Sequence, residues 1–173
     1  MKKICLAVVC LLIAAVSFAQ EPPKPNPKLK QLQPFIGTFT CTGTAIDGPG
    51  APEHPTKGTV VGKWAENNYW VAATYKQVKT AKNPHPYAGQ GFWGFDEETQ
   101  KFVSGWVDNM GAYQIAESSG FEGDAITWNG PNHFGGKTYK SRDVFTKTAK
   151  GIHHIFSMEM DGKWVQLADE TCK

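Results

Sequence analysis

The sequence predicts an all-β protein, an antiparallel up-and-down barrel of about ten strands. Short aromatic and β-branched runs alternate with turn sequences along residues 35–172, and no helical period longer than one or two turns interrupts them. The connections are too short for the crossovers that parallel strands require. Apart from Cys5 and Cys10 in the apolar N-terminus, the cysteines are Cys41 and Cys172, one near each end of the strand-rich region. A disulfide between these two would join the first strand to the last.

Residues 1–19 have the three parts of a secretory signal peptide. A pair of lysines precedes the almost wholly apolar run Ile4–Val16, and small residues flank Phe18 before the expected cleavage at Gln20. The apolar run is shorter than the roughly 20 residues of a membrane-spanning helix. A lipoprotein signal at Cys10 is the alternative. We therefore expect an exported protein, periplasmic or secreted, with no membrane span.

The mature chain is expected to be one domain with almost no net charge. Cleavage removes two lysines from a chain whose formal net charge is +2. Residues 20–33 form a Pro-rich tether, with a short helical turn at Leu29–Leu32 that caps one end of the fold, and residues 34–173 form the barrel. No basic stripe remains, so neither nucleic acid nor an anionic membrane is an expected partner. The oligomeric state is left open.

The first half of the barrel is expected to contain five strands, and period-two alternation of threonines marks the first of them. These strands are Phe35–Thr44, Thr59–Trp64, Tyr69–Val78, Gly89–Phe95 and Lys101–Asp108. The connections between them are rich in Gly, Pro, Asn and acidic residues, which favour turns. They comprise the loops Asp47–Lys57 and Ala81–Pro86 and the turns Glu66–Asn68 and Asp96–Thr99.

Five further strands complete the barrel. They are Ala112–Ser118, Ala125–Asn129, Thr138–Lys147, Ile152–Met160 and Trp164–Thr171. A Gly-rich loop is expected at Gly130–Gly136. Between the last two strands, Asp161-Gly162 separates two apolar runs, which is among the strongest short signals for a β-hairpin. An even number of strands in this order makes the first and the last antiparallel neighbours.

The two distal cysteines orient the first and the last strand. An exported protein folds in an oxidising compartment, so we expect Cys41 and Cys172 to form a structural disulfide. Phe39 is expected to plug the barrel, and Cys41, two residues on, then faces inward as well. Cys172 must share this inner face, and strand alternation carries further residues of the last strand inward with it. These residues are Trp164, Gln166, Ala168 and Glu170.

One histidine is expected inside the barrel. His154 falls on the apolar face of its strand, with Ile152, Phe156, Met158 and Met160. A core histidine with its hydrogen bonds satisfied is the favoured interpretation, and a contact to a polar ligand or to a haem or metal is the alternative. His153 faces the opposite way, so the two histidines cannot chelate one ion together. No histidine pair has metal-site spacing, and no metal or cofactor is expected.

Tryptophans, carboxylates and one arginine supply the remaining candidates for a ligand site. Arg142 is the only arginine, and its planar fork suits a carboxylate such as Glu170 or Asp108, although its direction is not settled. A buried Glu170 should contact Arg142, His154 or a tyrosine hydroxyl, or lie at a wet barrel mouth. The six tryptophans suit a core or, as a group, an aromatic pocket. The candidate ligand-binding residues are Trp93, Trp106, Asp108, Arg142, His154 and Glu170.

The central hairpin carries a family resemblance. The segments Gly91–Asp96 and Lys101–Gly111 resemble the signature of a bacterial exported family known only as domain of unknown function 1579, and Phe35–Phe39 is similar to the start of that family. The resemblance implies a calycin-like, lipocalin-like β-barrel and, in many members, export. The family brings no established catalytic residues, so none is transferred to this chain.

Three functions are compatible with these observations. The leading hypothesis is a binding protein that holds a small apolar or amphipathic molecule inside the barrel, an argument from fold and aromatic content. The second is an enzyme of isomerase or cyclase type with Asp108, His154 or Glu170 as acid or base, although no nucleophile–base pair shows in the spacing. The third is a structural or interaction protein with a filled core. We lean against an enzyme and expect no catalytic residues.

Overall fold

The computed structural model describes residues 23–48 and 50–173, so the signal peptide expected at residues 1–19 lies outside the described part. Eleven strands and two short 3₁₀ helices make up the fold. They are η1 (Pro27–Phe35), β1 (Gly37–Ala45), β2 (His54–Ala65), η2 (Glu66–Asn68), β3 (Trp70–Gln77), β4 (Ala88–Asp96), β5 (Lys101–Asp108), β6 (Tyr113–Ser118), β7 (Phe121–Glu122), β8 (Ala125–Phe134), β9 (Lys137–Thr148), β10 (Gly151–Met160) and β11 (Lys163–Cys172).

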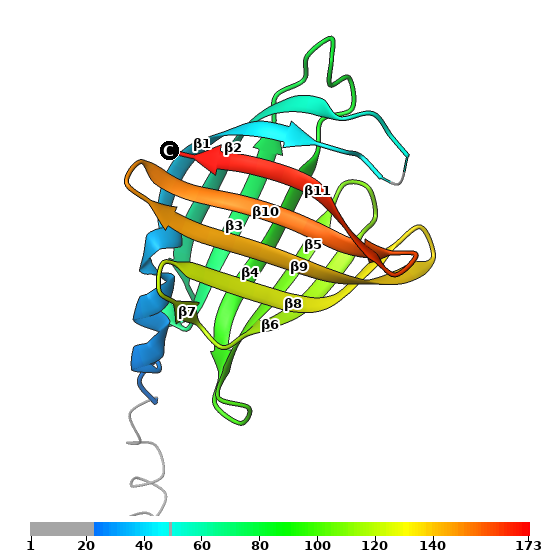
Figure 1. Cartoon of the computed structure of the whole chain (residues 1–173). Coiled ribbons are helices and arrows are strands. Elements are labelled where there is room, and N and C mark those ends of the chain that lie inside the picture. Colours follow the sequence, from blue (N-terminus) through cyan, green and yellow to red (C-terminus); the bar gives the residue numbers. More distant parts are fainter. Residues whose placement is uncertain (1–22, 49) are drawn as a thin grey trace, which may run out of the picture.

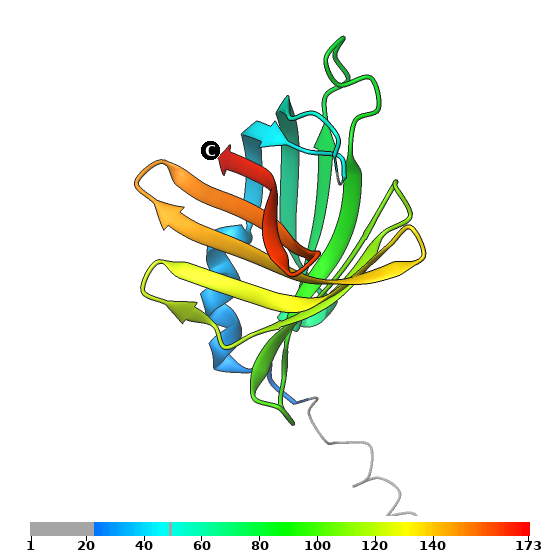
Figure 2. The ribbon, with the colours of Figure 1, turned by 45° about the vertical axis from the view of Figure 1, so that its right-hand side comes forward.

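The strands form one closed antiparallel barrel (Figures 1 and 2). Strands β1 to β6 pair in sequence order, β8 to β11 do the same, and β1 pairs with β11. A further pairing of β6 with β8 closes the cylinder, while the two-residue β7 pairs only with β8. The predicted up-and-down barrel of ten strands is therefore confirmed, with β7 as a short addition.

The predicted disulfide lies across the seam between the first and the last strand. Cys41 and Cys172 are direct partners in the β1–β11 ladder, and their sulfur atoms are bonded. Next to them, Thr40 and Lys173 exchange both backbone hydrogen bonds, at 2.8 and 2.9 Å. The cysteines therefore occupy a non-hydrogen-bonded pair, in which opposite side chains approach most closely. The disulfide joins two cysteines that are 131 residues apart in the sequence.

Helix η1 closes one end of the barrel (Figure 1). Asn26 Oδ1 accepts a hydrogen bond from Lys28 N at the start of the helix, where a proline at the first position needs no partner. The helix then buries Leu29, Leu32 and Phe35 against the barrel core. The helical cap expected at Leu29–Leu32 is confirmed. Within the Pro-rich segment expected at residues 20–33, the part from Pro27 onward thus packs on the barrel through its apolar side chains.

Most turns lie where the sequence predicts them, but two loops are shorter than expected. Asp161 and Gly162 both have positive φ, as the two-residue hairpin requires. The loop predicted at Gly130–Gly136 is wrong for most of its length, because β8 continues to Phe134 and pairs with β9 throughout. Likewise β2 begins at His54 rather than near Thr59. Cross-strand pairing here outweighs the low β-propensity of Gly, Pro and Asn.

A bulge in β11 overturns part of the expected inward-facing set. Phe156 pairs with Ala168, but the next residue of β10, Ser157, pairs with Gln166, so one extra residue is inserted in β11. Leu167 and Ala168 consequently both line the barrel interior. Alternation reverses on the N-terminal side of the bulge, and Gln166 and Trp164 are exposed on the outer wall instead of facing inward. The prediction for Ala168, Glu170 and Cys172 holds.

Candidate functional site

The interior of the barrel contains a partly open cavity of about 250 Å³. At the volume of liquid water this is room for roughly eight water molecules. Phe35 of η1 and Phe39 of β1 contribute to the lining, and so do Asp47, Gly48 and Met110 from the loops at the opposite end of the barrel. The wall is mostly apolar, and eleven aromatic side chains of the described residues contribute to it. They are Phe35, Phe39, Tyr75, Tyr87, Trp93, Trp106, Tyr113, Trp128, Phe134, Phe145 and Phe156.

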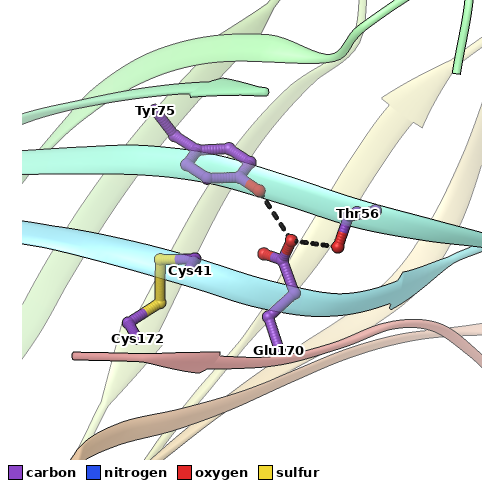
Figure 3. Close-up of a disulfide and its surroundings, with 5 residues drawn as sticks. All are labelled: Cys41, Thr56, Tyr75, Glu170 and Cys172. Atoms are coloured by element: carbon purple, nitrogen blue, oxygen red, sulfur yellow. Dashed lines mark hydrogen bonds between the residues drawn. A yellow bond between two sulfur atoms is a disulfide. The ribbon is translucent and has the colours of Figure 1, made fainter. Parts of the chain in front are cut away.

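One polar cluster of the cavity centres on Glu170. This carboxylate is 5% exposed, and its Oε1 accepts hydrogen bonds from Tyr75 Oη and Thr56 Oγ1, both at 2.6 Å. Figure 3 shows the three side chains converging beside the disulfide. The expected contact of Glu170 with a tyrosine hydroxyl is confirmed, and the partner is Tyr75. Burial, followed by the charge of Glu170, raises the pKa of Tyr75, so its hydroxyl remains a donor.

Two glycines on the inner faces of β1 and β2 make this cluster possible. In the ladder, Gly43 lies between Glu170 and Thr56, and a Cβ at Gly43 would come within 2.7 Å of the Glu170 backbone. A Cβ at Gly58 would lie 2.5 Å from the ring of Tyr75. Glu170 therefore reaches across β1 to Thr56, and Tyr75 lies over β2, because both intervening positions lack a side chain.

A second polar cluster contains His154. Its Nε2 lies 2.9 Å from Oδ1 of Asp143, while Oδ2 of Asp143 accepts a hydrogen bond from Gln114 Nε2 at 3.0 Å. Gln114 also donates to Ser141 Oγ at 2.7 Å. The imidazole stacks on Phe145, with ring centroids 4.3 Å apart. His154 thus lines the cavity as a histidine oriented by a carboxylate and an aromatic ring.

The third set of polar groups lies toward the end of the barrel opposite η1. Trp106 Nε1 donates a hydrogen bond of 2.7 Å to the hydroxyl of Tyr87. Burial and then the charge of Asp108 raise the pKa of Tyr87, so this hydroxyl is neutral. Asp108 accepts the backbone N–H groups of Met110 and Ala112, each at 2.9 Å. These bonds shape the turn between β5 and β6.

Arg142 lies outside the cavity, contrary to the expected pairing with an internal carboxylate. Its guanidinium lies 4.6 Å from the ring centroid of Trp164, which the β11 bulge has turned outward. The outer wall also carries His153, whose Nε2 lies 2.7 Å from Oδ1 of Asp169. Arg142 is absent from the cavity lining, so its guanidinium does not face the internal carboxylates.

The structure brings five of the six candidate ligand-binding residues to the cavity wall. These are Trp93, Trp106, Asp108, His154 and Glu170. Sequence reasoning did not identify Tyr75 as the tyrosine that contacts Glu170, and it missed Thr56 as the second partner. It also missed Asp143 and Gln114 as the partners near His154. The parity of β3 could have revealed Tyr75, because Val71, Ala73 and Tyr75 alternate as its buried set. The register that pairs Asp143 with Phe156, two residues from His154 on β10, has no comparable signal.

Two further properties concern residues 23–48 and 50–173. No group of three or more His, Cys, Asp or Glu side chains is arranged to hold a metal ion. No helix in this part of the chain has the length and apolar character needed to cross a membrane.

The closed antiparallel barrel with an internal aromatic cavity defines a calycin-like protein. Residues 24–172 match the family described as "Protein of unknown function (DUF1579)", and the chain belongs to this family. None of the curated proteins compared with the chain matches it. Among solved structures, the crystal structure of Rv2717c from M. tuberculosis is similar, with a TM-score of 0.64 and 12% sequence identity. The similarity covers 86% of this chain and 98% of that one, and it concerns the fold.

Proposed function

We propose that the protein is an exported carrier that binds a small apolar or amphipathic molecule inside its barrel. The observation that carries the proposal is the cavity of about 250 Å³, whose walls are mainly apolar, with many aromatic side chains, and include a few buried polar groups. Ligand pockets generally combine apolar walls with a small number of polar groups that orient the ligand. A structural barrel with a filled core would leave no such space.

Export is part of the proposal. It rests on the signal-peptide pattern of residues 1–19 and on the bonded cysteines of the barrel seam. Disulfides persist in oxidising compartments such as the periplasm or the extracellular medium. Secretion of the mature chain with Gln20 at its N-terminus, read by N-terminal sequencing of the exported protein, tests this part.

Native mass spectrometry of protein purified from its own host tests the binding function. We expect a bound molecule in the wild type. Val60 lines the cavity, whereas its neighbour Val61 on the same strand does not. Val60→Phe adds bulk inside the cavity and should lower the fraction of protein that carries the molecule, and Val61→Phe should leave this fraction unchanged as the matched control. Wild-type protein that carries nothing and takes up no small aromatic probe would refute the proposal.

An acid–base enzyme is the second candidate, favoured by the 2.9 Å contact between His154 and Asp143 at the cavity wall. A histidine oriented by a carboxylate is a common general base. An isomerase would leave the mass of its substrate unchanged, so the bound molecule must be compared by fragmentation. An enzyme predicts different isomers in wild-type and His154→Gln protein, whereas a carrier predicts the same one in both.

A further inference from the structure

The charged groups that line the cavity are almost all acidic. Asp47, Asp108, Asp143 and Glu170 contribute to the wall, whereas no lysine or arginine among residues 23–48 and 50–173 does so. His154 is the one lining side chain in this part of the chain that a proton can make cationic. The electrostatic potential of the cavity therefore favours a positive or a neutral ligand over an anion.

Three of the four carboxylates, those of Asp47, Asp108 and Asp143, are more exposed than Glu170. Asp47 and Asp143 each lie 2.9 Å from a histidine ring nitrogen. Asp108 accepts two backbone N–H groups. Glu170 differs from these three because it is only 5% exposed, and among the described residues its donors are two neutral hydroxyls and no ion pair reaches it.

The free acceptor capacity of Glu170 lies on one oxygen. Both hydroxyls bond to Oε1, and no hydrogen bond from the described residues reaches Oε2 (Figure 3). Glu170 is 95% buried and lines the cavity. A carboxylate withdrawn from water without a counter-charge is costly, and an ammonium group with its N–H donors would relieve that cost.

Aromatic rings surround this end of the cavity. Tyr75, which bonds to Glu170, packs in one cluster with the disulfide and with Phe39, Tyr87 and Trp106. The faces of such rings attract cations, and aromatic walls accept the apolar body of an amphipathic amine. We propose that the barrel selects small organic cations, whose ammonium group is bound by Glu170 and whose apolar body lies against these aromatic side chains. This inference rests on the proposed carrier function.

Three probes that share one body and differ in charge test this proposal. They are phenethylamine, phenylethanol and phenylacetate, titrated into the full mature protein by calorimetry. A hydrogen bond to a charged partner contributes enough to change affinity by roughly tenfold to a hundredfold. We expect phenethylamine to bind tighter than phenylethanol by that factor and phenylacetate to bind weakest. This ratio of the affinities for phenethylamine and phenylethanol tests the cation preference with the wild-type protein alone.

Two variants of adjacent residues assign the preference to its carboxylate. Glu170→Gln removes the charge but keeps an oxygen acceptor for the two hydroxyls, so it should bring the affinities for phenethylamine and phenylethanol to within about threefold of each other. Asp169→Asn changes the neighbouring carboxylate, which bonds to His153 on the outer wall, and should leave the ratio unchanged.

Each remaining outcome overturns a defined part of the reasoning. If phenylethanol binds as tightly as phenethylamine to the wild type, the cation preference is wrong while the carrier function stands. If the preference survives in Glu170→Gln, the assignment to Glu170 is wrong and this carboxylate is structural. If none of the three probes binds, the carrier function fails for ligands of this size, and the inference fails with it.

Discussion

Replacing Glu170 tests how the polar interior contributes to folding. Its Oε1 accepts two hydrogen bonds of 2.6 Å, from Tyr75 and Thr56, and all three residues are less than a tenth exposed. Glu170→Ala would leave two buried hydroxyls without their acceptor. A buried polar group deprived of its partner costs about 1–3 kcal/mol.

The expected cost of Glu170→Ala is therefore about 2–4 kcal/mol, since removal of the buried charge regains part of the sum for two hydroxyls. Glu170→Gln keeps an acceptor oxygen and should cost about 1 kcal/mol or less. A double-mutant cycle with Tyr75→Phe should show a coupling free energy on the order of 1 kcal/mol, because the two side chains share one hydrogen bond.

Urea unfolding followed by tryptophan fluorescence and circular dichroism gives these free energies. Asp169→Ala is the control, since its carboxylate is half-exposed on the outer wall and its ion pair with His153 is worth less than about 1 kcal/mol. Glu170→Ala with wild-type stability would refute the inward, hydrogen-bonded placement of Glu170. A cost for Asp169→Ala equal to that of Glu170→Ala would contradict the assignment of the two faces.

Three other outcomes are expected from the same unfolding assay. Reduction of Cys41–Cys172 should lower the free energy of unfolding by up to about 5 kcal/mol, because the bond closes a loop of 131 residues; two reactive thiols in unreduced exported protein would contradict it. The pKa values of Tyr75 and Tyr87 are raised in the folded protein, so above about pH 10 these tyrosines ionise in the unfolded chain first. The free energy of unfolding should therefore be constant with respect to these two groups below about pH 10 and fall above it by up to about 1.4 kcal/mol per pH unit for each. Tyr75→Phe should lessen this fall. Gly58→Ala should cost about 1–3 kcal/mol because its Cβ would meet the Tyr75 ring at 2.5 Å, and an unchanged stability would refute this close approach.

The sequence predicted the interior of β11 well only on one side of its bulge. From Ala168 to Cys172, the disulfide anchors the period-two alternation, and Glu170 faces inward as expected. The insertion at Leu167 then shifts the alternation by one residue, which turns Trp164 outward. A bulge depends on the strand that is paired opposite, so no pattern within β11 itself reveals it.

The sequence pattern of its own strand likewise did not determine which way the Arg142 side chain points. Its rarity suggested a carboxylate partner, but the guanidinium stacks on Trp164, a residue that reached the outer wall through the β11 bulge. The cavity carboxylates form hydrogen bonds with hydroxyls, histidines and backbone N–H groups instead. The predicted carboxylate partner of Arg142 is therefore wrong, and tertiary packing decided that its partner is the Trp164 ring.

What the sequence by itself determined is the barrel and its closure. Alternation, short turns such as Asp161-Gly162 and one cysteine near each end are local properties, and an antiparallel meander follows from them. The tertiary structure alone decided the polar geometry of the cavity. Glu170 and Tyr75 are far apart in the chain, and they come into contact over the backbone of Gly43 and Gly58. The ladder register aligns these positions, and the two glycines have no side chains in between. Register across several strands is a property of the assembled sheet, so no single segment encodes it.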